Sequence, residues 1–190
     1  MANLNPYSSF ATDLTGWSPT NTGALARSTA QFKDDTASCL VTVNAIDDGL
    51  ISDYFHGCAG STVYQLSFWV YCLTGNIDFT VGKNEADQPG GYLTNDQEGP
   101  LTGILNTWTE LKILMAATDP ACEQIQVYIQ NGSSTNDFYI DKIYFGPEIT
   151  VTLDDCLPDA DVTTTGWTTT PLFSKINDAS DATVIQATAV

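Results

Sequence analysis

The chain has 190 residues, 43% of them hydrophobic, which is enough for one folded core of about 150 residues and an additional segment. Only six Lys and Arg residues accompany 23 Asp and Glu residues, and the formal net charge is −17. This charge repels phosphate groups, so we expect neither nucleic acid nor an anionic membrane surface as a partner, and the composition does not support membrane insertion.

Residues 1–7 lack both the basic start and the apolar segment of a secretory signal, so export by that route is not expected. Five cysteines have spacings that match no zinc-binding pattern. They are Cys39, Cys58, Cys72, Cys122 and Cys156. We interpret them as buried thiols of a protein made in a reducing cytoplasm, and a Cys58–Cys72 disulfide stays open as an alternative for one pair.

Short segments of alternating hydrophobicity recur along the chain. In the clearest of them, residues 64–71, apolar side chains alternate with Gln65, Ser67, Trp69 and Tyr71, so a strand there has one buried and one open face. The segments are Cys39–Val43, Leu50–Phe55, Val63–Cys72, Ile77–Val81, Leu111–Met115, Ile125–Ile129 and Phe138–Phe145. Seven or more short strands predict an all-β, antiparallel sandwich.

Turn-forming residues separate these segments, and none of the separators has a helical period. The longest separator, Gly82–Asn106, contains two clusters of Gly, Pro and acidic residues. We expect it to be a long loop with a short extra strand around Tyr92, and loops of this length are often binding or contact elements.

The composition changes after Gly146 and Pro147, so we predict one domain over 1–147 and a separate segment over 148–190. Thr165-Gly166-Trp167 repeats Thr15-Gly16-Trp17, but only 23 residues follow Trp167, far fewer than the roughly 100 of a complete sandwich. The segment is therefore expected to be either an incomplete second β module or an extended arm. An arm would add a strand to a neighbouring copy, which favours a homo-oligomer.

The order of several landmarks resembles that of jelly-roll carbohydrate-binding modules with a galactose-binding-like fold. The matching residues are Asn5-Pro6, Phe10, Gly16-Trp17, residues 64–70, Thr107-Trp108-Thr109 and Phe138-Tyr139-Ile140-Asp141. The resemblance covers about residues 3–146 and implies a jelly roll. It does not by itself imply sugar binding, because one sandwich serves many functions.

The C-terminal segment, residues 158–179, resembles a segment that recurs in structural proteins of tailed bacteriophages. The resemblance implies a virion protein of the tail, collar or capsid surface, assembled in the cytoplasm of the host bacterium. Its expected partners are other virion proteins and further copies of the chain. Assembly, together with attachment to the host surface, is the function that the sequence favours.

The resemblance to jelly-roll modules also implies a structural calcium ion where the N-terminal segment meets the last strand. Asp141 matches the acidic residue of that strand, and Asp13, Asp34 or Asp35 could complete the oxygen ligands. The alternative is that Asp141 accepts hydrogen bonds from backbone amides of a turn or bulge. We therefore expect no obligatory cofactor, with calcium as an option.

Five residues on the predicted open faces are candidates for contact with a glycan or a partner. They are Asp53, Trp69, Tyr71, Gln126 and Tyr128. Aromatic rings can stack on a sugar while polar side chains bind its hydroxyl groups. The alternative is that the Gly82–Asn106 loop or another subunit covers these rings. Trp17, Trp108 and Trp167 are interpreted as core residues.

Enzymatic activity is not expected. His56 is the only histidine, no hydrolase or phosphate-binding motif is present, and the paired carboxylates are adjacent in sequence, so they diverge in an extended chain. The main alternative to a virion protein is a glycan-binding module that recognises bacterial surface polysaccharide. A further alternative is an accessory domain of a secreted hydrolase.

Overall fold

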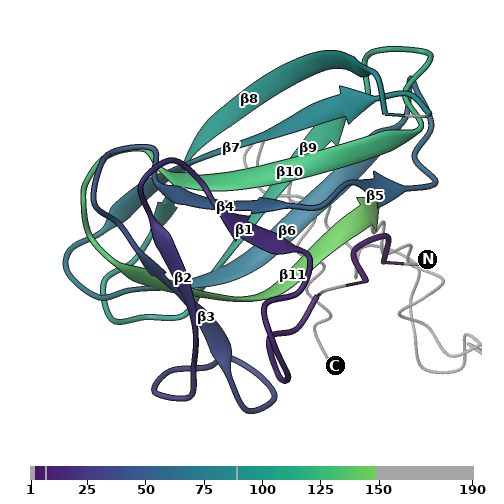
Figure 1. The fold of residues 1–190 in the computed structure, drawn as a ribbon. Coiled ribbons are helices and arrows are strands. Elements are labelled where there is room, and N and C mark those ends of the chain that lie inside the picture. Colours follow the sequence, from purple (N-terminus) through teal and green to yellow (C-terminus); the bar gives the residue numbers. More distant parts are fainter. Residues whose placement is uncertain (1–2, 7, 89, 149–190) are drawn as a thin grey trace, which may run out of the picture. The chain divides into compact units, whose positions relative to one another are not determined.

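The computed structural model describes residues 3–6, 8–88 and 90–148, and these form an antiparallel β-sandwich (Figure 1). This confirms the predicted all-β jelly roll. The described residues contain no helix long and apolar enough to cross a membrane. The predicted arm or second module lies outside the described residues from Ile149 onward, and so do Cys156 and Trp167.

Sheet A has six strands. In spatial order they are β1 (Trp17–Pro19), β4 (Gly49–Ser52), β10 (Gln124–Asn131), β7 (Ile77–Ala86) and β8 (Tyr92–Gly103), and β5 (Phe55–His56) also pairs with β10 (Figure 1). The predicted strand Leu50–Phe55 is divided between β4 and β5. It leaves β10 at Ser52, where the Ser52 hydroxyl accepts the amide of Val127 at 3.0 Å in place of a backbone carbonyl.

Sheet B has five strands. In spatial order they are β2 (Ala24–Ser28), β3 (Ser38–Thr42), β11 (Phe138–Pro147), β6 (Val63–Cys72) and β9 (Thr109–Ala116). The N-terminal segment is hydrogen-bonded to β11, since the Leu4 amide donates to the Phe145 carbonyl at 2.7 Å. The strand predicted most clearly, Val63–Cys72, has the same bounds in the structure.

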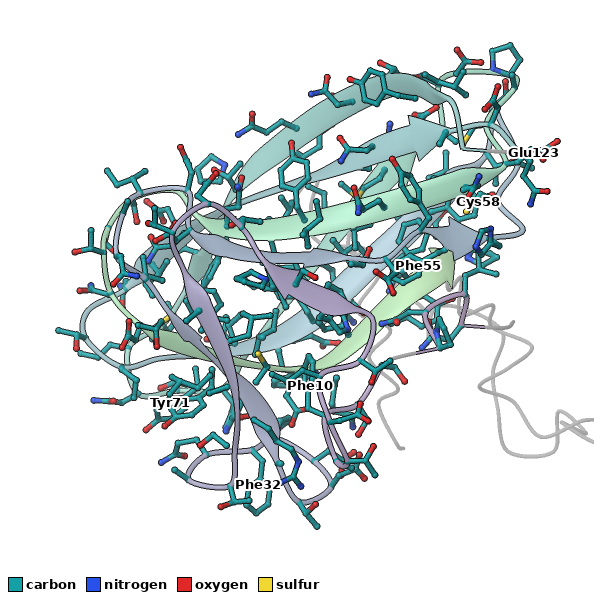
Figure 2. All side chains as sticks on the ribbon, in the orientation of Figure 1. Phe10, Phe32, Phe55, Cys58, Tyr71 and Glu123 are labelled. Carbon is teal, nitrogen blue, oxygen red and sulfur yellow. The ribbon has the colours of Figure 1, made fainter. Side chains whose placement is uncertain are left out.

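The core lies between the two sheets and contains the predicted inward residues of β6, but Gln65 and Ser67 of its predicted open face are also buried, with 8% and 7% exposure. Tyr64, Leu66, Phe68 and Val70 of β6 are all buried. Their neighbours include an aromatic stack in which Phe145 lies between Tyr64 and Phe55, with both pairs of ring centroids 5.3 Å apart. Figure 2 shows Phe10 and Phe55 within this layer. Burial of these large side chains is the main stabilising contribution to the sandwich.

The expected loop Gly82–Asn106 is mostly a β-hairpin, which corrects the prediction. Strand β7 continues to Ala86, and β8 returns beside it from Tyr92. The prediction stopped at Val81 because the inward positions that follow are the charged residues Lys83 and Glu85. They form an ion pair in which both side chains are fully buried.

Glu85 has further partners in the turn that follows β9. The backbone amides of Thr118 and Asp119 each donate to its carboxylate at 2.9 Å, and the Thr118 hydroxyl donates at 3.2 Å. The hydrogen bonds and the Lys83 ammonium compensate the carboxylate for the water that it loses on burial. Strand β7 can therefore carry two charges on its buried face.

The four cysteines of the described residues are free and buried. The alternative of a Cys58–Cys72 disulfide is wrong. Tyr64, near the start of β6, accepts a hydrogen bond from the amide of Ala59, next to Cys58, whereas Cys72 ends the same ten-residue strand. A strand of this length spans roughly 30 Å, far beyond disulfide reach.

Candidate functional site

The outer face of sheet A carries a tyrosine that lies along the sheet. Tyr128 of β10 is paired directly with Gly82 of β7. A methyl group added at Gly82 would lie 2.2 Å from both Cζ and Oη of Tyr128, so the end of the ring occupies the space above Gly82. The hydroxyl continues to β8 and donates to the Asp96 carbonyl at 3.3 Å. The ring therefore spans three strands and presents one face outward.

A row of amide side chains lies beside this ring. Gln126 of β10 and Asn84 of β7 are paired in register, and the Asn84 Nδ2 donates to the Gln126 Oε1 at 3.0 Å. The Gln126 Nε2 in turn donates to the Ser52 carbonyl at 2.7 Å. Asn95 of β8 lies opposite Asn84 and is exposed. These contacts fix the orientation of the inner two amides and leave the third open to solvent.

A second tyrosine marks the far end of the same face. Tyr92, at the start of β8, is 63% exposed and lies opposite Ala86. Ala86 is paired with Gln124, which is paired with His56 of β5. Three successive rows of residues paired across the strands therefore cross this face. The first row contains Tyr128, the second contains the three amides, and the third contains Tyr92. Such a surface offers aromatic rings at two points with hydrogen-bonding groups between them.

The side chains of these rows include no Asp, Glu, Lys or Arg. They are Ser18, Ile51, Tyr128, Gly82 and Gln97 in the first row, Gln126, Asn84 and Asn95 in the second, and His56, Gln124, Ala86 and Tyr92 in the third. Burial raises the pKa of Tyr128 above its ordinary value of 10.0, and the Asp96 carboxylate and Tyr92 act in the same direction. The Tyr128 hydroxyl consequently stays protonated and neutral.

A pocket of about 330 Å³ lies near the edge of this face. The candidate residue Asp53 lines it, together with Tyr54 and His56 from the β4–β5 connection and residues of the N-terminal segment. Asp53 is exposed. Three of the five predicted contact residues, Asp53, Gln126 and Tyr128, therefore belong to sheet A or its border.

The other two predicted contact residues lie on sheet B. Trp69 and Tyr71 belong to the outward side of β6, so the five residues do not form one site, because two packed sheets present their outer faces in opposite directions (Figure 2 labels Tyr71). The side of the strand predicted for each of these residues is correct. Alternation specifies a side of the strand, but it does not say which sheet the strand joins.

The outer face of sheet B is partly covered by the chain itself. The Lys33 ammonium, from the β2–β3 connection, lies 4.0 Å from the centre of the Trp69 ring. Tyr71 packs against Trp108 and Tyr139, with ring centroids 5.6 and 6.3 Å away. Trp108 is thus a residue of this outer face, and the prediction that it belongs to the core is wrong. Trp17 is buried in the core as predicted.

The carboxylates proposed for calcium are not grouped together in the structure. Within the part of the chain that the structure describes, no group of three or more His, Cys, Asp or Glu side chains is arranged to hold a metal ion. Asp141 is buried and accepts the amides of Lys33, Asp34 and Lys142 at 2.8 to 3.2 Å. This matches the alternative of an aspartate bound to backbone amides.

Two of the partner acids of the calcium prediction have other contacts. Asp13 accepts the Thr15 amide at 2.9 Å, and Asp35 accepts the Ser9 hydroxyl at 2.6 Å. Burial raises the pKa of Asp141, although its three amide partners act in the opposite direction. Asp13, Asp35 and Asp141 thus accept hydrogen bonds from other groups, and calcium binding stays a prediction.

Sequence reasoning missed Gly82, Asn84 and Asn95, because all three lie in the segment predicted as a loop. One signal was available. Continuing the alternation of Ile77–Val81 through four more residues puts two opposite charges, Lys83 and Glu85, on one face, where they can neutralise each other. The same extension puts Gly82 and Asn84 on the outer face.

The sequence matches no protein-family model and no curated protein. Solved structures do share its fold. The C-terminal family 22 carbohydrate-binding module of Clostridium thermocellum Xyn10B is 19% identical, with a TM-score of 0.62 over 76% of this chain and 93% of that one. The CBM22-1 xylan-binding domain of Paenibacillus barcinonensis Xyn10C is 15% identical, with a TM-score of 0.59 over 73% and 90% of the two chains.

A viral protein has the same fold in part of its chain. The enzymatically active domain of tailspike protein 4 of bacteriophage CBA120 is 14% identical, with a TM-score of 0.56 over 76% of this chain but only 21% of that one. The chain has the jelly-roll fold of carbohydrate-binding modules. This agrees with the fold implied by the sequence resemblance, and at these identities it is the fold alone that is shared.

Proposed function

We propose that the protein is a glycan-binding module that holds an extended, uncharged polysaccharide on the outer face of sheet A. The observation that carries the proposal is the Tyr128 ring, which lies over Gly82 and is tethered to Asp96. A ring held along the sheet can stack on the apolar face of a pyranose without first losing rotational freedom. It is non-enzymatic in this role.

The groups around the ring suit a neutral sugar chain. The ordered amides of Gln126 and Asn84 supply both donors and acceptors for hydroxyl groups, and Tyr92 provides a second ring further along the face. A net charge of −17 opposes binding of uronic acids or phosphorylated glycans. The fold shared with two carbohydrate-binding modules supports the same function.

A virion protein is the second candidate, and the likeness to a bacteriophage tailspike favours it. The two functions are compatible, since a glycan-binding face could attach a particle to bacterial surface polysaccharide. In that case other virion proteins, further copies of the chain and a host glycan would be the partners. Glycan binding has the wider support, because the face itself has the required chemistry.

The test is binding of the full chain to an array of neutral and acidic polysaccharides, followed by titration with the best ligand. Soluble xylan, a β-1,4-galactan and polygalacturonate belong in the panel. We expect binding to at least one neutral polymer and none to polygalacturonate. Replacing Tyr128 with Ala should weaken binding at least tenfold, equivalent to about 1.4 kcal/mol.

The matched control is Trp69→Ala, which removes an equally large ring from the opposite face. It should leave the affinity within twofold of the unmodified protein. If Trp69→Ala abolishes binding while Tyr128→Ala does not, the ligand lies on sheet B and the proposed face is wrong. Binding to polygalacturonate in preference to neutral polymers would contradict the proposal that the ligand is an uncharged polysaccharide.

A further inference from the structure

Two buried thiols meet at one end of the sandwich. Cys58 follows β5 by two residues, Cys122 precedes β10 by two residues, and β5 pairs with β10 in antiparallel register with His56 opposite Gln124. The two cysteines therefore lie just beyond the same end of this strand pair. The backbones remain joined there, because the Cys58 amide donates to the Glu123 carbonyl at 3.1 Å, and Figure 2 shows Cys58 beside Glu123.

Both thiols point into the core. Simple alternation from the exposed His56 would turn Cys58 outward, but Gly57 has a φ of 80° and reverses the chain locally. Cys58 and Cys122 are 7% and 2% exposed and belong to the same hydrophobic core. The Cys58 Sγ contacts the Phe55 carbonyl and the Cys122 Sγ contacts the Gln124 carbonyl. The thiols are thus near neighbours on adjacent segments and face the same way.

Cys39 and Cys72 provide a contrast. Cys39 lies opposite Ile140 and Cys72 opposite Phe138, so β11 separates their strands. Two strand spacings amount to roughly 10 Å, which exceeds the limit of about 7 Å between the Cα atoms of a disulfide. Among the four described cysteines, Cys58 and Cys122 are the pair that strand pairing brings together.

We propose that Cys58 and Cys122 are a site of intramolecular disulfide formation by a small-molecule disulfide such as oxidised glutathione. One cysteine attacks the oxidant, forms a mixed disulfide and releases one glutathione thiol. The second cysteine then displaces the second glutathione thiol and forms the protein S–S bond. The two cysteines lose two protons and two electrons, and the oxidant takes them up as two thiols.

The reaction should take place during folding rather than in the folded protein. Burial raises the pKa of Cys58 to about 12, and the neighbouring Cys122 adds to the increase. Burial also raises the pKa of Cys122, together with the Glu85 carboxylate. The attacking species is the thiolate, which is scarce in the folded protein at neutral pH.

The test is peptide mapping of the full chain after refolding from urea with reduced and oxidised glutathione. Free thiols are blocked in acid, and the protein is digested with trypsin without reduction. Cys122 is the one cysteine of tryptic peptide 113–142, whereas peptide 34–83 contains Cys39, Cys58 and Cys72. We expect these two peptides to be linked, with fragment spectra that assign the bond to Cys58. The proposal would be overturned if Cys122 were recovered only as a chemically blocked free thiol, or if it were bonded to another cysteine.

Thermal unfolding gives a second readout on the same samples. A bond between Cys58 and Cys122 closes a loop of about 65 residues, and the oxidised protein should melt about 10 °C above the same protein treated with dithiothreitol. The Cys58→Ala and Cys122→Ala variants should lose this difference, and the matched control Cys39→Ala should keep it. An equal melting temperature in the mapped, linked protein would show a strained bond without a stabilising role, which would contradict the geometry inferred here.

Discussion

Gly82→Ala tests whether the lack of a side chain at Gly82 allows the Tyr128 ring to lie along the outer face of sheet A. Gly82 lies in mid-strand and is not among the residues with a positive φ, so its value lies in the space that it leaves and not in its backbone freedom. An alanine there should displace the Tyr128 ring. The affinity for the polysaccharide should therefore fall although the ring itself is still present.

The structure sets the size of the effect. The new methyl carbon would lie 2.2 Å from Tyr128 Cζ and 2.4 Å from the Asp96 carbonyl oxygen, whereas carbon atoms normally approach to about 3.5 Å. The ring must move by more than about 1 Å and lose its bond to Asp96. Overpacking of this kind costs about 1–3 kcal/mol of unfolding free energy, or roughly 3–10 °C in Tm. Loss of the stacking geometry should weaken binding about tenfold.

A double-mutant cycle separates the ring from the backbone. Removing the ring in Gly82→Ala/Tyr128→Ala should relieve part of the clash, so the double variant should be more stable than the sum of the two single effects by at least about 0.5 kcal/mol. Its affinity should stay low. The assays are thermal unfolding and titration with the best polysaccharide. A Gly82→Ala protein with unchanged Tm and affinity would refute the reasoning, because the ring could not then lie over Gly82.

Three further predictions concern charge and metal. Glu85→Gln should cost about 3 kcal/mol in urea unfolding at pH 7, because it removes the buried counter-charge of Lys83 and leaves only the Asp96 carboxylate, which is 3.8 Å away and 45% exposed. Burial alone would raise the pKa of Glu85, but Lys83 and the two amides outweigh it and hold the pKa below 4.5. The carboxylate thus stabilises the fold above its unfolded pKa of 4.5, and the stabilisation should be lost as the pH falls through the lower folded pKa. In Glu85→Gln, this dependence of the unfolding free energy on pH should be weaker. Glycan affinity should change less than twofold between pH 5 and 9, because the raised pKa of Tyr128 keeps its hydroxyl neutral, and a larger change would contradict this reasoning. A chelator should leave the Tm unchanged, and a drop that calcium restores would show that Asp141 binds metal after all.

Much of the sandwich could be predicted because its signal is local. Strand β6 has the predicted bounds, and its inward residues Tyr64, Leu66, Phe68 and Val70 are buried as expected. Burial on one side of a strand requires a period of two in the sequence, wherever the strand lies in the fold. The short strands β1 and β2 carry no such pattern: β2 has no fully buried residue, and they were not predicted.

The hairpin of β7 and β8 was missed for a different reason. Lys83 and Glu85 break the apolar pattern, and they are tolerated because Thr118 and Asp119, more than 30 residues away, supply amides to the carboxylate. No local rule can anticipate that compensation. The same limit applies to Trp108, whose place on the outer face depends on Tyr71 of another strand.

The sequence by itself determined the class of fold, the inward residues of the strands with clear alternation and the outward position of Tyr128, Gln126, Trp69 and Tyr71. Only the tertiary structure decided that the first two lie on sheet A and the last two on sheet B. The physical reason is that side-chain alternation is a property of one strand, whereas membership of a sheet depends on backbone hydrogen bonds between segments that are distant in the chain. The space above Gly82, which holds the Tyr128 ring, exists only once those segments pair.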